Sequence, residues 1–273
     1  MSETPQLTDR AALELHRARA LRDPALFLHE EALAEIQDRL SLVNKTFKRV
    51  AIVTPFPQVW QSSFPDAHII PDTDILDLTE GAHDLIIHAM ALHWANDPVG
   101  QLIQCRRALV PDGLLLVIAP GGQTLHELRA ALGQAEVEIT GGLSPRVAPM
   151  AEIRDLGGLL QRAGLALPVA DSAVVNTSYA SALHLMRDLR AMGETNALTN
   201  RIKCPTRREV MLRAVALYGE AYKRDGDRIA ATFELITLTG WAPDASQPQP
   251  LRPGSAVGRL ADALNTAETP LKD

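Results

Sequence analysis

A single arginine stands in a glycine-flanked loop near the middle of the chain. The loop reads Gly141-Gly142-Leu143-Ser144-Pro145-Arg146. A guanidinium on such a loop can hold a carboxylate of a ligand or partner protein through two parallel hydrogen bonds. The alternative is a structural ion pair inside the protein. Ser144 and Arg146 are therefore candidate contacts to a substrate or a partner.

A second polar group lies in residues 185–196, on a segment with helical spacing. Its apolar positions form one stripe at Leu185, Met186, Leu189 and Met192. The charged residues of the same segment are Arg187, Asp188, Arg190 and Glu194, and Gly193 could end the helix. The charged group could close over a substrate or bind a partner, and the alternative is a solvated helix face.

His93 and Trp94 follow a predicted strand, at the end of the sheet where open α/β folds bind ligands. Trp94 could stack on an adenine ring or cap a pocket, or it could be a core aromatic residue. His93 has a weaker case as a general base. His83, His88 and His93 are five residues apart across a strand and a loop, a pattern that is not typical of a metal site, so no metal is expected.

The elements that must position these residues alternate between short aliphatic runs and amphipathic segments. Strands are predicted at 49–54, 67–70, 84–87, 114–119, 167–176 and 229–240, and helices at 8–22, 25–43, 98–109, 123–138, 149–163, 179–193 and 205–223. Thr8 is expected to cap the first helix. The alternation predicts an α/β fold with a parallel sheet and helices on both faces. The expected organisation is N-terminal helices at 1–46, a sheet domain at 47–242 and a loop-like tail at 243–273.

Composition restricts the partners and the compartment. The net charge is -6, which argues against nucleic acid, because phosphate binding needs clustered basic residues. Two cysteines, Cys105 and Cys204, lie far apart and suit a reducing compartment. No signal peptide and no membrane span is expected, since no apolar run reaches about 18 residues. A cytoplasmic protein is therefore expected.

Several stretches carry a family resemblance. Residues 84–97 (DLIIHAMALHWAND) and 106–115 (RRALVPDGLL) resemble the fourth strand, following helix and fifth strand of class I S-adenosylmethionine-dependent methyltransferases. A narrower resemblance, to the mitochondrial complex I assembly factor 5 family and its bacterial homologues, is carried by 121–129 (GGQTLHELR), 141–146 (GGLSPR), 155–164 (DLGGLLQRAG) and 185–196 (LMRDLRAMGETN). The biotin-pathway malonyl carrier-protein methyltransferases are similar too.

The resemblance covers nearly the whole chain and implies a Rossmann-like methyltransferase sheet. It also implies S-adenosylmethionine as a possible cofactor. The implied partner is a protein, a respiratory complex I subunit in which an arginine is hydroxylated rather than methylated.

The cofactor site of this superfamily needs a glycine-rich turn after the first strand and an acidic residue after the second. Here the first strand runs into Thr54-Pro55-Phe56-Pro57, and no glycine occurs between Arg49 and Glu80. The positions that match the site are Thr54, Asp72, Asp74, Leu92, His93 and Trp94, with Asp77 a further acidic candidate. Two outcomes stay open: a remodelled loop binds the cofactor or another ligand, or Phe56 and Trp60 fill the pocket.

The same region is too short for the full fold. Only 29 residues separate Thr54 from Asp84, whereas one βαβ unit needs about 30 or more. One strand–helix unit is therefore expected to be missing after the first strand.

Three functions follow. The main expectation is a methyltransferase-family enzyme of the complex I assembly type with a degenerate cofactor loop. The alternatives are a non-catalytic assembly or binding factor on the same fold, and a methyltransferase of a carrier-protein or small-molecule carboxylate. Catalytic residues stay unassigned.

Overall fold

The computed structural model describes residues 6–248, 258 and 260–266. They divide into two units, residues 1–243 and 244–273. The helices are α1 (Arg10–Ala20), α2 (Phe27–Leu42), α3 (Pro57–Gln61), α4 (Pro98–Ala108), α5 (His126–Thr140), α6 (Ile153–Arg162), α7 (Ala182–Ala191), α8 (Arg208–Ala221) and α9 (Leu260–Leu264), with 3-10 turns η1 (Leu92–Trp94) and η2 (Asp225–Asp227). The strands are β1 (Val50–Val53), β2 (His68–Ile70), β3 (His83–Ala89), β4 (Leu109–Pro120), β5 (Ala166–Tyr179), β6 (Lys223–Arg224) and β7 (Arg228–Trp241).

These strands form one mixed sheet. The order is β2-β1-β3-β4-β7-β5, and β6 pairs with β7. The first four strands are parallel, and β7 is antiparallel to both β4 and β5. The predicted α/β class and Rossmann-like sheet with helices on both faces are confirmed.

Alternate residues of the parallel strands build the two halves of the core. Ile52 and Ile87 face the apolar side of α2 and the indole of Trp60, whereas Ala51 and Ile86 face α4 and α6. This alternation follows from the two-residue period of a strand, and both faces are buried because helices cover both.

The region between β1 and β3 is reduced, as predicted. Only β2 lies there, the five-residue α3 precedes it, and residues 71–82 return to β3 without a helix or a strand. One strand–helix unit is missing, because a covered crossover of normal length would need a helix of its own.

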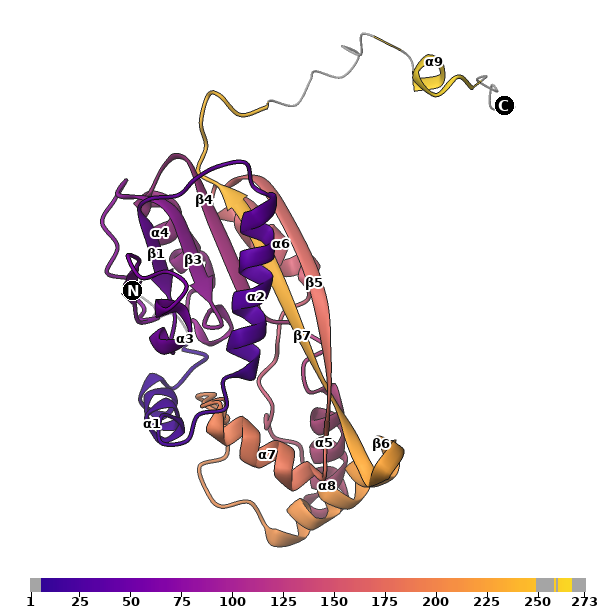
Figure 1. Cartoon of the computed structure of the whole chain (residues 1–273). Coiled ribbons are helices and arrows are strands. Elements are labelled where there is room, and N and C mark those ends of the chain that lie inside the picture. Colours follow the sequence, from indigo (N-terminus) through magenta and orange to yellow (C-terminus); the bar gives the residue numbers. More distant parts are fainter. Residues whose placement is uncertain (1–5, 249–257, 259, 267–273) are drawn as a thin grey trace. The chain divides into compact units, whose positions relative to one another are not determined.

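β5 and β7 are the longest strands, at 14 residues each, and they extend beyond the parallel strands (Figure 1). The register explains this, since β4 pairs only with Leu235–Trp241 of β7, while β5 pairs along nearly its whole length. The extended part of this pair packs against α5, α7 and α8. The part of β7 before Leu235 therefore pairs with β5 but not with β4, and it forms a smaller layer with these helices.

Two local details differ from the sequence predictions or lie beyond them. The first helix is capped by Asp9, whose side chain accepts a hydrogen bond from the backbone N–H of Ala12, and Thr8 is not the cap. Thr8 instead pairs its backbone with Leu198 in an isolated bridge. The division into segments 1–46, 47–242 and 243–273 stays a prediction, and residues 249–257, 259 and 267–273 of the tail lie outside the described part of the chain.

Candidate active site

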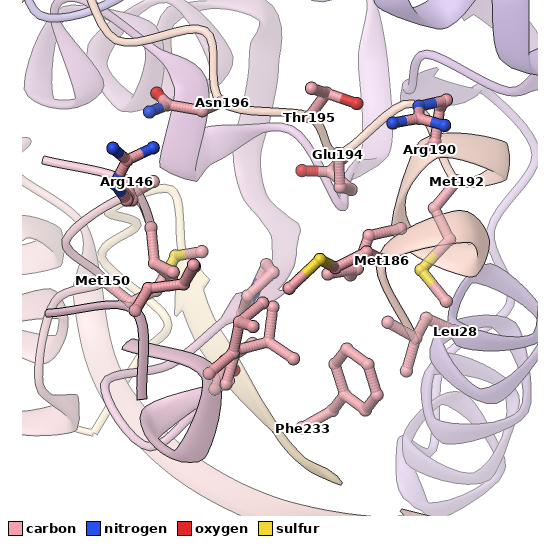
Figure 2. A pocket seen from close by; sticks show the side chains of 18 of the residues that line it. Leu28, Arg146, Met150, Met186, Arg190, Met192, Glu194, Thr195, Asn196 and Phe233 are labelled. Carbon is pink, nitrogen blue, oxygen red and sulfur yellow. The ribbon is translucent and has the colours of Figure 1, made fainter. Parts of the chain in front are cut away.

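A cavity of about 390 Å³ lies where β7 leaves β4 (Figure 2). Its floor includes Phe233 and Leu235 of β7, and its walls come from α2, α5, α7, α8 and the segments at 146–150 and 194–196. Apolar side chains predominate inside, with charged and amide groups among them. A concave, largely apolar cavity with a few polar groups is the usual form of a ligand or substrate site.

Glu194 is a carboxylate in the lining of this cavity. Its Oε2 accepts hydrogen bonds from Nε1 of Trp94 at 2.7 Å and from Nε2 of His93 at 3.0 Å. Burial opposes ionisation, but His93, Arg17 and the Trp94 N–H together lower the pKa of Glu194 to about 2. The hydrogen bonds to Glu194 from described residues all end on Oε2, so Oε1 can accept from a bound ligand.

Glu194 reaches this position because α7 ends at a glycine. Gly193 has a φ of +78°, and the backbone N–H of Glu194 donates to the carbonyl of Leu189 at 3.0 Å, which closes the helix. A Cβ on Gly193 would lie 3.2 Å from Cα and 3.1 Å from Cγ of Arg17. Only glycine therefore allows α7 to end this close to α1.

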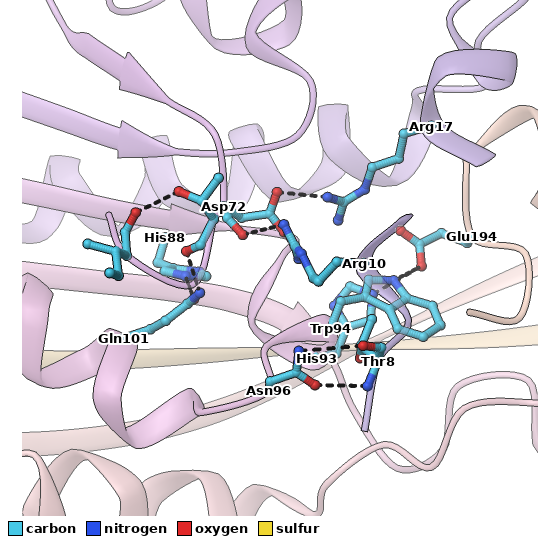
Figure 3. A network of polar contacts seen from close by, with 12 residues as sticks. Thr8, Arg10, Arg17, Asp72, His88, His93, Trp94, Asn96, Gln101 and Glu194 are labelled. Carbon is cyan, nitrogen blue, oxygen red and sulfur yellow. Dashed lines mark hydrogen bonds and ion pairs between the residues drawn. The ribbon is translucent and has the colours of Figure 1, made fainter. Parts of the chain in front are cut away.

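Asp72 follows β2, where the superfamily places its ribose-binding acid, and it is held by α1 (Figure 3). Oδ1 accepts from Nη1 of Arg17 at 2.7 Å and Oδ2 from Nη1 of Arg10 at 3.2 Å. Nη2 of Arg10 also donates to the Asp72 carbonyl at 2.7 Å. Arg17 and Asp72 are both buried, so the two arginines occupy the oxygens that a ribose would need.

The turn after β1 does not fit S-adenosylmethionine either. Phe56 and Trp60 are fully buried, and the ring of Phe56 packs edge-on against His29 with centroids 4.8 Å apart. Thr54, also buried, accepts a hydrogen bond from the backbone N–H of Phe56. These contacts leave the backbone of β1 covered where the cofactor would approach it, so the residues present do not fit the cofactor in its usual position.

Arg146 forms an ion pair and also lines the cavity. Its Nη2 and Nε donate to the two oxygens of Glu136, at 2.7 and 3.1 Å, and Ser144 donates to the same carboxylate from its hydroxyl and its backbone. Burial opposes ionisation of Glu136, yet Arg146 and Ser144 bring its pKa below the usual value. The remaining Nη1 of Arg146 donates to the Thr206 hydroxyl at 2.9 Å.

The other candidates are distributed around the cavity or away from it. Arg190 lines the cavity and is exposed, whereas Arg187 is exposed outside its lining. The hydroxyl of Tyr179 donates to Asp188 at 2.7 Å. Asp74 is exposed, and its carbonyl accepts from Gln104.

Trp94, Arg146, Arg190 and Glu194 therefore share the cavity lining, and His93 contacts it through Glu194. The lining does not include Thr54, Asp72, Asp74, Leu92, Ser144, Arg187 or Asp188. Their roles in cofactor, substrate or partner binding stay predictions.

Sequence reasoning missed two features of this region. Arg10 and Arg17 gave no signal, since arginines on an amphipathic helix are ordinary. The other feature is the set of methionines that line the cavity, Met90, Met150, Met186, Met192 and Met211. The sequence shows that methionine is rare in this chain, but it does not show that these methionines line one cavity.

Two features are absent from the described residues. Within residues 6–248 and the described part of the tail, no group of three or more histidine, cysteine or acidic side chains could hold a metal ion. In the same residues, no helix combines the length and apolarity needed to cross a bilayer.

The chain is similar to two groups of characterised proteins, although no protein-family model matches it. "Arginine-hydroxylase NDUFAF5, mitochondrial" is 38% identical in Danio rerio over 74% of this chain and 62% of that protein, and 37% identical in Homo sapiens over 72% and 57%. "Malonyl-[acyl-carrier protein] O-methyltransferase" of Methylovorus sp. is 34% identical over 65% of this chain and 57% of that protein. The chain thus spans less than two thirds of the length of these relatives.

Solved structures give more distant likenesses. Phosphoethanolamine N-methyltransferase 2 of Haemonchus contortus, in complex with S-adenosyl-L-methionine, has a TM-score of 0.41 at 12% identity, covering 78% of this chain and 52% of that one. An S-adenosylmethionine-dependent methyltransferase of Mesorhizobium loti has a TM-score of 0.37 at 14% identity, covering 77% and 99%. Likenesses this distant carry no functional argument.

The expected cytoplasmic location is wrong by this comparison. The relatives at 37–38% identity are named as mitochondrial proteins, which points to a mitochondrial location instead. Cysteine usage and the pattern of the first residues were insufficient ground for the expectation.

Proposed function

We propose that this chain is an enzyme of the class I S-adenosylmethionine-dependent methyltransferase superfamily and that it acts on an arginine side chain of a protein. The relatives named arginine hydroxylases support an arginine as the target. The proposed protein is a subunit of respiratory complex I during assembly, as the family resemblance implies.

One observation carries the proposal: an ionised carboxylate with an available oxygen lines a substrate-sized cavity. Trp94 and His93 hold Oε2 of Glu194 and leave Oε1 for a ligand. A guanidinium is a suitable ligand because it is planar, always charged and able to donate several hydrogen bonds to an oxygen acceptor. Glu194 thus binds and orients the target arginine.

Trp94 and His93 act as positioning residues in this proposal. Both donate to Glu194, and an ionised carboxylate only accepts, so Nε2 of His93 carries the hydrogen. Nδ1 of His93 is buried without a hydrogen-bond partner among the described residues. The chemical step is not routed through S-adenosylmethionine, because Asp72 and the turn after β1 do not fit it.

The proposal is tested by mass spectrometry of complex I subunits. We expect one arginine to lose its added oxygen when the gene for this chain is deleted. In the deletion strain, the Glu194→Gln variant should restore about tenfold less of the modified arginine than the parent protein does. The matched control is Glu31→Gln, at an exposed position of α2, which should restore it fully. An unchanged set of modified arginines after deletion would contradict the proposal.

A second function, a non-catalytic assembly factor, is favoured by the arginines on Asp72. The state of the arginine in cells separates the two functions, and calorimetric titration with S-adenosylmethionine and S-adenosylhomocysteine tests whether the cofactor site is remodelled. Binding at micromolar affinity would support a remodelled cofactor site. No binding by the folded protein, together with unmodified arginines in cells that contain it, would favour the assembly factor.

A further inference from the structure

The methionines of this chain are concentrated in one place. The sequence contains six, and each one after Met1 lines the cavity: Met90, Met150, Met186, Met192 and Met211. They come from five different places, namely the end of β3, the segment before α6, α7, the turn after α7, and α8. The stripe of a single helix therefore does not account for them.

The rest of the core is built from stiffer side chains. The two large clusters on the faces of the sheet consist mainly of leucine, isoleucine, valine and alanine, and the second contains no methionine among its buried members. Methionine has an unbranched, polarisable side chain that adapts to differently shaped partners, and it is frequent at surfaces that bind varied sequences. The methionine side chains thus line the space that an occupant of the cavity would fill.

Three of the five are accessible to such an occupant. Met150, Met186 and Met211 are half-buried, whereas Met90 and Met192 are buried. Figure 2 shows Met150 and Met186 around the cavity, with Phe233 nearby. An apolar side chain that enters would contact thioethers from three separate elements.

The charges around the cavity favour a cationic occupant over an anionic one. Two of its three arginines are ion-paired, Arg146 with Glu136 and Arg201 with Asp9 at 2.9 Å, and the third, Arg190, is exposed. Glu194 is ionised, and Glu234 is a second carboxylate in the lining. A fatty acid or another apolar anion would meet these two carboxylates, with Arg190 as the one arginine of the lining outside an ion pair.

We propose that the cavity is the docking site for a protein segment in which the target arginine is flanked by large apolar residues. The methionines receive the flanking side chains, and Glu194 receives the guanidinium. This inference rests on the proposed function and adds to it the sequence class of the substrate. It excludes an arginine within a uniformly polar segment as a good substrate.

Four fluorescent peptides test this with the full chain, by anisotropy. They carry arginine or its uncharged analogue citrulline at the centre, with leucine or serine at the two positions on each side. We expect the arginine–leucine peptide to bind about tenfold or more tightly than the arginine–serine peptide, since burying even one leucine contributes roughly 1.5 kcal/mol, which corresponds to about tenfold in affinity.

The matched variants replace the three half-buried methionines together. Met150→Gln, Met186→Gln and Met211→Gln, in one protein, should remove most of the preference for leucine flanks while leaving the preference for arginine over citrulline. The same three changed to leucine keep the wall apolar and should retain most of the leucine preference. Glu194→Gln should have the opposite effect to the triple methionine-to-glutamine variant. It should reduce the preference for arginine over citrulline and leave the preference for leucine flanks.

These arms separate the two proposals. If the glutamine variant, shown to be folded by circular dichroism, keeps the full leucine preference, the docking inference is overturned while arginine recognition stands. If leucine-flanked citrulline binds as well as leucine-flanked arginine, the proposed function fails and the apolar docking site stands. Displacement of the peptide by dodecanoate at lower concentration than by unlabelled peptide would make the cavity a lipid site and overturn the inference.

Discussion

Gly193 is the residue that determines how closely α1 and α7 approach each other. Its left-handed backbone ends α7 and directs Glu194 toward His93 and Trp94, while Arg17 lies against the position of its missing side chain. The geometry of the carboxylate in the cavity thus depends on a residue without functional groups.

We expect Gly193→Ala to lower the free energy of unfolding by about 3 kcal/mol, of which about 1 kcal/mol comes from the positive φ. The rest comes from contacts with the backbone of Arg17, which cannot rotate away. The matched control is Gly226→Ala, because Gly226 has a φ of +70° with nothing within 4 Å of its missing Cβ. Gly226→Ala should lower the free energy of unfolding only by the part that comes from the positive φ, about 1 kcal/mol. Urea unfolding of both variants measures the difference, and equal losses would show that the contact with Arg17 is unimportant.

At this scale the sequence predicted residue types better than their partners. His93, Trp94, Arg146 and Glu194 were all candidates, but the bond between Trp94 and Glu194 joins positions 100 residues apart. Local periodicity does not carry such information. For Arg146 the sequence left two roles open, a contact to a ligand and a structural ion pair. The structure shows an ion pair with Glu136 on the preceding helix α5. The sequence pattern of α5 did not show whether Glu136 faces the protein or the solvent.

At the scale of elements, α1 covers Asp72, the residue that the sequence predicts as a ribose-binding acid. Arg10 and Arg17 extend from one helix face to Asp72, and the start of α1 is tied to the segment after α7 by a bridge between Thr8 and Leu198. Buried charges of this kind are costly to separate, because each one needs its counter-charge. The N-terminal helix is consequently part of the sheet domain's electrostatic structure.

Asp72→Asn should therefore destabilise the protein by about 3 kcal/mol, since Arg17 would stay buried without a full counter-charge. Asp74→Asn is the control, because Asp74 is exposed on the same segment, and its loss should be within about 0.5 kcal/mol. Thermal or urea unfolding measures both. A variant at Asp72 that is as stable as the parent, but has lost affinity for S-adenosylmethionine, would identify Asp72 as a ribose ligand instead.

Elements with strong local patterns were predicted well. The strand at 84–87 became β3 and the helix at 98–109 became α4, each within two residues at either end, and the count of 29 residues correctly predicted the missing unit. The extension of β5 and β7 past the parallel strands was not predicted. It depends on pairing between residues such as Tyr179 and Ile229, which are distant in sequence and lack a shared local signal.

At the scale of the whole molecule, several buried histidines make the fold sensitive to acid. His29 and His88 are nearly inaccessible to water, and burial lowers the pKa of both, that of His29 to about 4. The unfolded chain takes up these protons near pH 6.5, before the folded chain does. Stability is therefore full above pH 6.5 and is lost as the pH falls below it. Glu194 adds nothing in this window, because its contribution is lost only below about pH 4.5.

His29→Phe should make the stability less dependent on pH. Between pH 7.5 and 5.5 the parent should lose about 1 kcal/mol more than the variant, since one fewer histidine is protonated on unfolding. Exposed His184 provides the control, and His184→Asn should follow the parent curve. Urea midpoints at the two pH values measure this. Parallel curves for the parent and His29→Phe would mean that His29 is already protonated in the folded state.

The gathering of the methionines also decides how oxidants would affect this protein. A thioether that gains an oxygen becomes polar and chiral, and reductases can reverse the change. Because each methionine after Met1 lines the cavity and three of them are half-buried, peroxide would alter the wall of the site, whereas the core cluster that faces α4 and α6 has no buried methionine to oxidise. In a compartment that produces reactive oxygen, substrate docking would be the first property to fail, and methionine sulfoxide reductases would restore it without refolding the chain.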